Sequence, residues 1–495
     1  MREVTGVKRL LAVAVVGLSL LAGCSGDDGD VAGPDKPAVT TTTEAASLVG
    51  EATVTGPLTG GQHGFPQTST PFDLDAAGYV EEEFLLDGEA TSYRYTDEPG
   101  DDGEWSAEPA DTSPYTTRIL VRRPEDPAAF NGTVVVEWLN VTSNVDVDVD
   151  FGFLAEELLR EGYAWVGVTA QEVAVTSTGG GQFGDAAIGL QAWDPERYHD
   201  LSHPGDAYSY DIFSQAGAVL RTEAGQAALG GLVPDHVLAD GESQSAFRLL
   251  TYVNAVHPLA QVFDGFLIHS RDGGGAPLAD PAVTDPETSR VRTDGDAPVL
   301  QVETETDLFS LRADAPFPDA RQPDGERVHT WEIAGTAHAD SDYLAHLYEQ
   351  GTAQFEDFLD LRGVLAVANQ GPQTYVMRAA LRALHDWVID GVEPPIAEPM
   401  DVEAGAIVRD EHGNALGGVR TPAVDVPVAT LTGEGVPLIG STIPFAPAEL
   451  AELYGSTDGY LRAFDAALDD TVDAGFLLAD DIEELQADAE TVQIG

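Results

Sequence analysis

Basic residues are scarce in this chain. Its 495 residues include 24 Lys and Arg against 85 Asp and Glu, which gives a formal net charge of −61 at pH 7. A protein that binds nucleic acid must neutralise phosphates with cationic side chains, so no nucleic acid is expected as a partner. Anionic lipid headgroups would be repelled for the same reason. Because the acidic residues are spread along the whole chain, we interpret them as solvation of the surface.

Cysteine is almost absent as well. Cys24 is the single cysteine, so no disulfide can form within the chain and stability must come from a hydrophobic core. Hydrophobic residues make up 43% of the sequence, which is enough to build such a core. The apolar run from Leu10 to Leu21 is too short to span a bilayer as a permanent helix.

The first residues instead have the pattern of an export signal. Basic residues at positions 2, 8 and 9 precede the apolar run, and small residues follow it. The ending Leu21-Ala22-Gly23-Cys24 resembles the lipobox of bacterial lipoproteins, which implies that Cys24 is lipidated. An ordinary signal peptide with an incidental cysteine is the alternative. We expect a signal peptide over residues 1–24, a solvated tether over 25–50 and a catalytic domain over 51–495.

The pattern of the remaining chain predicts an α/β fold. Alternating residues over 79–86, 91–95 and 115–123 predict antiparallel strands at the N-terminal edge of a sheet. From residue 132 onward, apolar strands alternate with helical patterns, including one predicted helix over 211–229. This alternation predicts a mostly parallel central sheet with helices on both faces. Residues from about 396 to 495 are expected to form a C-terminal extension.

One stretch predicts a catalytic serine. Val237–Phe247 has the pattern of a nucleophile elbow, in which a strand turns sharply into a helix. The strained turn requires small neighbours, and Gly241 and Ser245 lie two residues either side of Ser243. The backbone N–H of Gln244, at the helix start, is expected to face an oxyanion. A Gly-x-Ser-x-Ser string by itself also occurs in ordinary turns, so its context has to decide.

The context supplies a base and an acid in the order found in α/β-hydrolases. Glu305 and Asp307 follow the predicted strand at 298–304, and His338 follows the predicted strand at 328–333. A serine nucleophile needs a histidine base and an orienting carboxylate, which predicts a triad of Ser243, His338 and an acid. We favour Asp307 over Glu305 as that acid, and expect the other carboxylate to be a solvated or turn residue.

Three other histidines and a second oxyanion donor complete the set of candidate groups. His236, His269 and His329 lie before or within strands, or ahead of the acid, so structural roles are expected for them. The second oxyanion donor is expected to be a backbone N–H near Leu139 and Asn140, after the strand that ends at Trp138.

A calcium loop is the competing interpretation of one acidic segment. Asp146, Asp148, Asp150 and Glu157 have the spacing of calcium ligands, but Phe151 stands where such a loop needs glycine. Asp150 is also placed to cap the helix that follows. Calcium binding therefore stays the weaker alternative, and no metal or organic cofactor is expected.

Several segments together resemble a bacterial family of α/β-hydrolase-domain proteins. They are Phe130–Val141, Trp193–Tyr198, His203–Ile212, the elbow Ser243-Gln244-Ser245 and the turn Gly335-Thr336-Ala337-His338. The resemblance covers about residues 50 to 490. It implies an α/β-hydrolase fold and a serine hydrolase, and says little about substrate.

These observations predict an extracytoplasmic, lipid-anchored serine hydrolase that acts on small-molecule or acylated carboxylic esters. Two alternatives remain open at this stage. The same triad could transfer the acyl group to an alcohol, or the chain could be a non-catalytic surface binding protein on a hydrolase fold. The membrane is expected to be contacted only through the N-terminal lipid.

The expected lipid anchor is testable by fractionation. Cys24→Ser removes the sulfur that would carry the lipid, so the variant should move from the membrane fraction to the medium. Immunoblots of the two fractions measure this, and a variant that stays in the membrane fraction would contradict lipidation at Cys24.

Overall fold

The structure is a computed structural model, and it describes residues 48–181, 188–278, 286, 288–309, 311 and 314–494. The predicted signal peptide, Cys24 and nearly all of the predicted tether therefore lie outside the described residues. Within the described part, no helix has the length and apolar character needed to cross a membrane.

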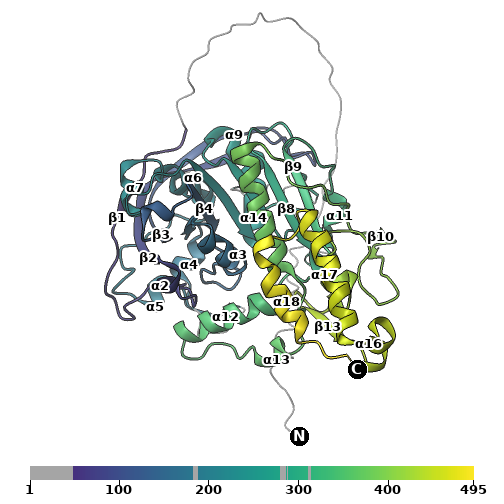
Figure 1. The fold of residues 1–495 in the computed structure, drawn as a ribbon. Helices are drawn as coiled ribbons and strands as arrows, with labels where there is room; N and C mark the ends of the chain where they lie inside the picture. The colour runs from purple at the N-terminus through teal and green to yellow at the C-terminus, as the bar shows by residue number, and fades with distance from the viewer. Residues whose placement is uncertain are drawn as a thin grey trace, which may run out of the picture.

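One sheet of nine strands organises the molecule (Figure 1). The strand order is β1-β2-β3-β5-β4-β6-β7-β8-β9, with antiparallel pairing from β1 to β5 and parallel pairing from there on. The strands are β1 (Thr53–Thr55), β2 (Tyr79–Tyr95), β3 (Ala107–Pro124), β4 (Thr133–Trp138), β5 (Ala164–Val168), β6 (His236–Glu242), β7 (Gly265–His269), β8 (Val299–Thr304) and β9 (Val328–Ile333). The predicted fold class is confirmed, with antiparallel strands at the N-terminal edge.

Helices cover both faces of this sheet because its inner strands are apolar on both sides. Side chains alternate along a strand, so Val135 faces one core while Val134 and Val136 face the other. The first core is closed by α3 (Val149–Arg160), α12 (Ser341–Gln354) and α14 (Gln373–Asp390). The second is closed by α6 (Ser209–Val219), α8 (Gln244–Thr251) and α9 (His257–Ala260).

Two sequence-based boundaries were wrong. The three predicted N-terminal strands are two, because β2 and β3 form one long hairpin whose pairing runs through the polar segment at residues 87–91. The predicted helix over 211–229 is interrupted after α6. A second helix, α7 (Glu223–Ala228), begins where the Thr222 side chain accepts a hydrogen bond from the Gly225 N–H.

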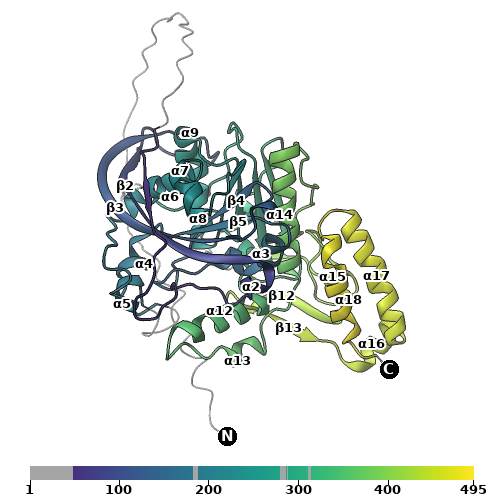
Figure 2. The ribbon, with the colours of Figure 1, turned by 60° about the vertical axis from the view of Figure 1, so that its left-hand side comes forward.

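The C-terminal residues form a lobe beside α14 (Figure 2). Its helices α16 (Pro447–Tyr454), α17 (Thr457–Asp473) and α18 (Ile482–Glu490) share the first core, where Trp331 of β9 packs edge-on against Phe476. Two small hairpins precede these helices: β10 (Val402–Glu403) with β11 (Ala406–Ile407), and β12 (Ala429–Val436) with β13 (Gly440–Pro444).

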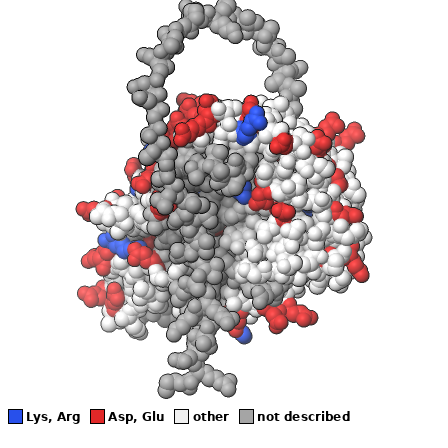
Figure 3. All heavy atoms as spheres, turned by 180° about the vertical axis from the view of Figure 1, so that it is seen from behind, with Lys and Arg blue, Asp and Glu red and all other residues white. Residues whose placement is uncertain are grey.

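Several arginines lie inside the molecule, whereas the charged side chains on the face in Figure 3 are mainly acidic. Arg118 of β3 is fully buried and pairs with Glu83 at 2.8 Å and Asp146 at 2.9 Å. Arg122, four residues on, pairs with Asp148 at 2.5 Å. These ion pairs attach the antiparallel edge of the sheet to the segment that leads into α3.

Arg118→Ala should lower the free energy of unfolding by about 3–5 kcal/mol, because buried Asp146 would lose its cation and buried Glu83 would keep only Arg197. Arg94→Ala is the matched control, since Arg94 pairs with Glu108 on the surface and should cost about 1 kcal/mol or less. Urea unfolding followed by tryptophan fluorescence measures both. Equal losses would show that the buried pairs do not hold the edge in place.

Candidate functional site

The turn between β6 and α8 has the geometry of a nucleophile elbow. Ser243 has φ 55° and ψ −114°, a conformation that costs energy for any residue other than glycine. Its N–H donates to the carbonyl of His269 at the end of β7, 2.9 Å away. A Cβ atom at Gly241 would lie 3.0 Å from the Cβ of Ser245, so both positions need small residues. Ser243 and Gln244 are only half-buried, which leaves the turn open to a substrate.

The structure brings the three predicted triad residues together. Nε2 of His338 lies 2.9 Å from Oγ of Ser243, and Nδ1 lies 2.8 Å from Oδ1 of Asp307. Each residue follows the carboxyl end of a strand: Ser243 follows β6, Asp307 lies in α10 (Glu305–Phe309) after β8, and His338 follows β9. The parallel sheet therefore gathers side chains that are far apart in sequence.

Asp307 and Glu305 have different surroundings. The second oxygen of Asp307 accepts hydrogen bonds from the N–H and the hydroxyl of Thr304, both at 2.7 Å, which fixes the carboxylate against the imidazole. Glu305 instead accepts from the N–H groups of Gly335 and Gly433 at 2.8 and 3.0 Å and pairs with Arg409 at 3.0 Å. The other carboxylate was expected to be a solvated or turn residue; Glu305 is buried, so it is not solvated, and it lies at the start of α10 directly after β8.

The predicted second oxyanion donors are already engaged. The N–H of Leu139 donates to the carbonyl of Val168 at 3.4 Å, and that of Asn140 donates to the carbonyl of Val147 at 2.9 Å. The Asn140 amide is held by a bond of ordinary length and is therefore not available to an oxyanion in this structure, whereas the Leu139 amide makes only a long bond to the sheet. The next amide, Val141 N–H, makes only a long bond of 3.4 Å to the side-chain oxygen of Gln244. The Gln244 N–H is the first of α8 and has no carbonyl of its own helix to bind.

A second carboxylate, which no sequence motif predicted, lies at the imidazole. Oε1 of Glu242 lies 3.0 Å from Nε2 of His338, and Oε2 accepts from the Asn140 side chain at 3.0 Å. Burial raises the pKa of Glu242 to about 7, against the attraction of His338 and His269. Burial alone would lower the pKa of His338, but Glu242 and Asp307 outweigh it and raise that pKa to about 9. The only sequence signal was position, since Glu242 directly precedes the serine.

The three other histidines considered in the sequence, His236, His269 and His329, have other surroundings. His269 is buried and bridges Asp150 at 2.7 Å and the Gln373 side chain at 2.9 Å. Burial lowers the pKa of His269 to about 4, which keeps it neutral. His329 packs edge-on against Trp387, and His236 lies at the opposite end of β6 from Ser243.

The carboxylates considered as calcium ligands are bound to other side chains of the protein. Asp146 and Asp148 pair with arginines, Asp150 pairs with His269, and Glu157 pairs with Arg160 and Arg382. Helix α3 is capped by Glu137, whose carboxylate accepts from the N–H groups at positions 150 and 151, rather than by Asp150 as predicted. Among the described residues, no group of three or more His, Cys, Asp or Glu side chains could hold a metal ion.

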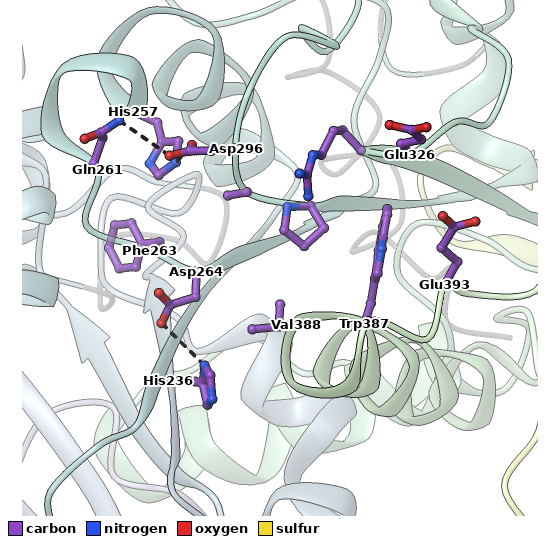
Figure 4. A pocket seen from close by; sticks show the side chains of 14 residues that line it. His236, His257, Gln261, Phe263, Asp264, Asp296, Glu326, Trp387, Val388 and Glu393 are labelled. Carbon is purple, nitrogen blue, oxygen red and sulfur yellow. Dashed lines mark hydrogen bonds and ion pairs between the residues drawn. The ribbon is translucent and has the colours of Figure 1, made fainter.

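A cleft of about 610 Å³ lies at the amino ends of the parallel strands, opposite the end that carries Ser243 (Figure 4). His236 at the start of β6, Pro298 before β8 and Arg327 before β9 line it, so it lies at the amino ends of the strands. None of the three residues of the triad geometry is among its lining residues. The cleft is therefore separate from the site at Ser243.

Comparisons with solved structures find proteins of low similarity. A bacterial heroin esterase is 14% identical with a TM-score of 0.32, and the match covers 65% of this chain and 87% of that one. An esterase of Thermogutta terrifontis is 15% identical with a TM-score of 0.27, covering 48% and 87%. A serine hydrolase of Xanthomonas campestris described as lacking a lid is 12% identical with a TM-score of 0.27, covering 54% and 92%. Likeness at this level says nothing about substrate.

No curated protein sequence matches the chain significantly. A family model described as an alpha/beta hydrolase domain matches residues 54–487, nearly all of the described chain. The match includes the elbow, the acid turn and the histidine turn. The chain therefore belongs to the α/β-hydrolase domain family.

Proposed function

We propose that this protein hydrolyses carboxylic esters through Ser243, His338 and Asp307, by way of an acyl-enzyme. The observation that carries the proposal is the unbroken hydrogen-bonded array from Ser243 Oγ through the imidazole to Asp307. The strained backbone at Ser243 adds support, because strain of this kind is kept only where the surrounding structure imposes it.

Acylation begins when Ser243 Oγ attacks the carbonyl carbon of the ester. The hydroxyl proton passes to Nε2 of His338, and the new imidazolium is stabilised by Asp307. The carbonyl π electrons move to oxygen and form a tetrahedral oxyanion. We assign its binding to the N–H of Gln244 and to that of Val141, which would exchange its long bond to the Gln244 side chain for the oxyanion.

The tetrahedral intermediate then collapses. His338 returns its proton to the leaving alkoxide, which departs as an alcohol and leaves the acyl group on Ser243. A water molecule then repeats the cycle. His338 takes a proton from the water, and the water oxygen attacks the acyl carbon. His338 returns the proton to Ser243 Oγ as the carboxylic acid departs. Every proton transfer in this sequence uses side chains of this chain.

We further propose that the protein acts outside the cytoplasm, attached to the membrane by a lipid on Cys24. The support is the sequence pattern alone: a basic start, a short apolar run and Leu21-Ala22-Gly23-Cys24. A net charge of −61 favours a lipid over electrostatic attraction as the means of attachment.

A fluorophosphonate probe tests the proposed nucleophile, because it reacts covalently with activated serines. The unmodified protein should be labelled on Ser243, and Ser243→Ala should abolish labelling. Ser245→Ala is the matched control and should keep the label, since this neighbour is fully buried. His338→Ala should slow labelling by several orders of magnitude. A folded protein that is not labelled would favour a binding protein over an enzyme.

The roles of the two neighbouring acids give a second test. Asp307→Asn should lower turnover of a small activated ester by up to about ten-thousandfold, because the imidazole loses its orienting charge. Glu305→Gln should retain turnover within about tenfold but lose about 1–3 kcal/mol of stability, since one N–H at Gly335 or Gly433 would lose its acceptor. Ester kinetics and thermal unfolding of both variants measure this. The reverse pattern would assign the orienting role to Glu305.

A further inference from the structure

We propose that Glu242 is a positioning residue for this reaction: its carboxyl group shares one proton with Nε2 of His338 and then stabilises the imidazolium during attack by Ser243. The inference rests on the proposed function. It assigns the triad histidine two carboxylate partners, Asp307 on Nδ1 and Glu242 on Nε2.

The geometry leaves Nε2 with two neighbours that compete for it. Ser243 Oγ is at 2.9 Å and Glu242 Oε1 is at 3.0 Å. A neutral imidazole whose proton sits on Nδ1 presents a lone pair at Nε2, and an ionised carboxylate at that distance would be repelled by it. One proton between Glu242 and Nε2 removes the repulsion, either as imidazolium beside carboxylate or as carboxylic acid beside neutral imidazole.

Glu242 is held in this place by the surrounding chain. The Asn140 side chain donates both to Oε2 and to the backbone carbonyl of Glu242, each at 3.0 Å. The Asn140 backbone is fixed in turn by two hydrogen bonds with Val147. Only 5% of the Glu242 side chain is exposed, so water cannot replace the imidazole as its partner.

The other titratable groups that face this pair carry little charge. Burial keeps His269, at the end of β7, neutral by lowering its pKa to about 4. Burial also raises the pKa of Tyr343 on α12 and of Asp150 on α3 well above their usual ranges, which favours their neutral forms. The charges that act on His338 are therefore those of Glu242 and Asp307.

Two consequences follow for the reaction. While the shared proton is present, Nε2 cannot accept the proton of Ser243, so the proton must first leave to solvent. Because the pKa of His338 is raised to about 9, the base form is lost as pH falls through that value, and activity should rise on an alkaline limb. Once Nε2 is free, the imidazolium formed in the transition state lies between two carboxylates, which lowers the barrier.

The rate of fluorophosphonate labelling as a function of pH tests the inference. The unmodified protein should show a limb near pH 9. Glu242→Gln removes the charge at nearly constant shape, so its limb should move at least one pH unit lower, and its alkaline plateau should fall because the imidazolium loses a partner. Glu242→Asp keeps a carboxylate and should keep the alkaline limb. Glu223→Gln, an exposed change of equal charge on α7, should leave the profile unmoved.

If Glu242 had only a structural role, Glu242→Gln would lower the labelling rate at every pH without shifting the pH of the limb. A limb that stays in place in Glu242→Gln would therefore overturn the inference. Absence of labelling at every pH would instead contradict the proposed function. A nuclear magnetic resonance titration of His338 in the Ser243→Ala protein separates the two, because it needs no catalysis. The imidazole signal, assigned by its loss in His338→Asn, should titrate near pH 9; a midpoint near 6.5 would overturn the inference even if Glu242→Gln does not fold.

Discussion

The sharp turn at Ser243 is the constraint on which the site depends. A residue at φ 55° is costly unless its surroundings hold it there, and here the Ser243 N–H is bound to the neighbouring strand while α8 begins at the next residue. The same turn projects the hydroxyl beyond the sheet and leaves the first N–H of the helix without a carbonyl partner inside α8. The backbone strain, the proposed nucleophile and the proposed oxyanion donor are therefore properties of one local conformation. The parallel sheet adds the acid and the base because it brings its carboxyl ends to one edge.

Scarce arginines occupy the interior of an acidic protein. The chain has 85 acidic side chains and only 24 Lys and Arg, so each buried carboxylate competes with many others for a cationic partner. Arg118 and Arg122 pair with Asp146 and Asp148 in the segment before α3. Arg409 pairs with Glu305 beside the proposed active site. Burial and neighbouring acids raise the pKa of Glu137 and Asp240 well above the usual range. Burial raises the pKa of Glu242 in the same way, which favours the proposed sharing of a proton with His338.

The sequence was sufficient for the parts of the site that are local. A strand followed by Gly-x-Ser-x-Ser and an amphipathic run predicts the elbow, and the order of strands predicts which acid and histidine lie near it. It was insufficient wherever a distant segment decides the outcome. Glu305 is buried because Gly433 and Arg409, more than a hundred residues later, bind its carboxylate. The amides of Leu139 and Asn140 are engaged because Val168 and Val147 fold back onto them, and no local pattern carries that pairing.

In the proposed mechanism, a second carboxylate beside the His338 imidazole has opposing effects on the resting protein and on the transition state. In the resting protein Glu242 competes with Ser243 for Nε2 and so reduces the population of free base at neutral pH. In the transition state, when the imidazolium has formed and the oxyanion has taken the negative charge, the same carboxylate lies against a cation and stabilises it. Only the second effect speeds catalysis, because only it is stronger in the transition state than in the ground state.

The balance between the two effects depends on pH. Above the pKa of His338, Glu242 no longer competes with Ser243 for Nε2, while its stabilisation of the imidazolium remains. Under the proposed mechanism, Glu242 therefore has its most favourable effect on the rate above the pKa of His338, where the imidazole is already free to act as the base.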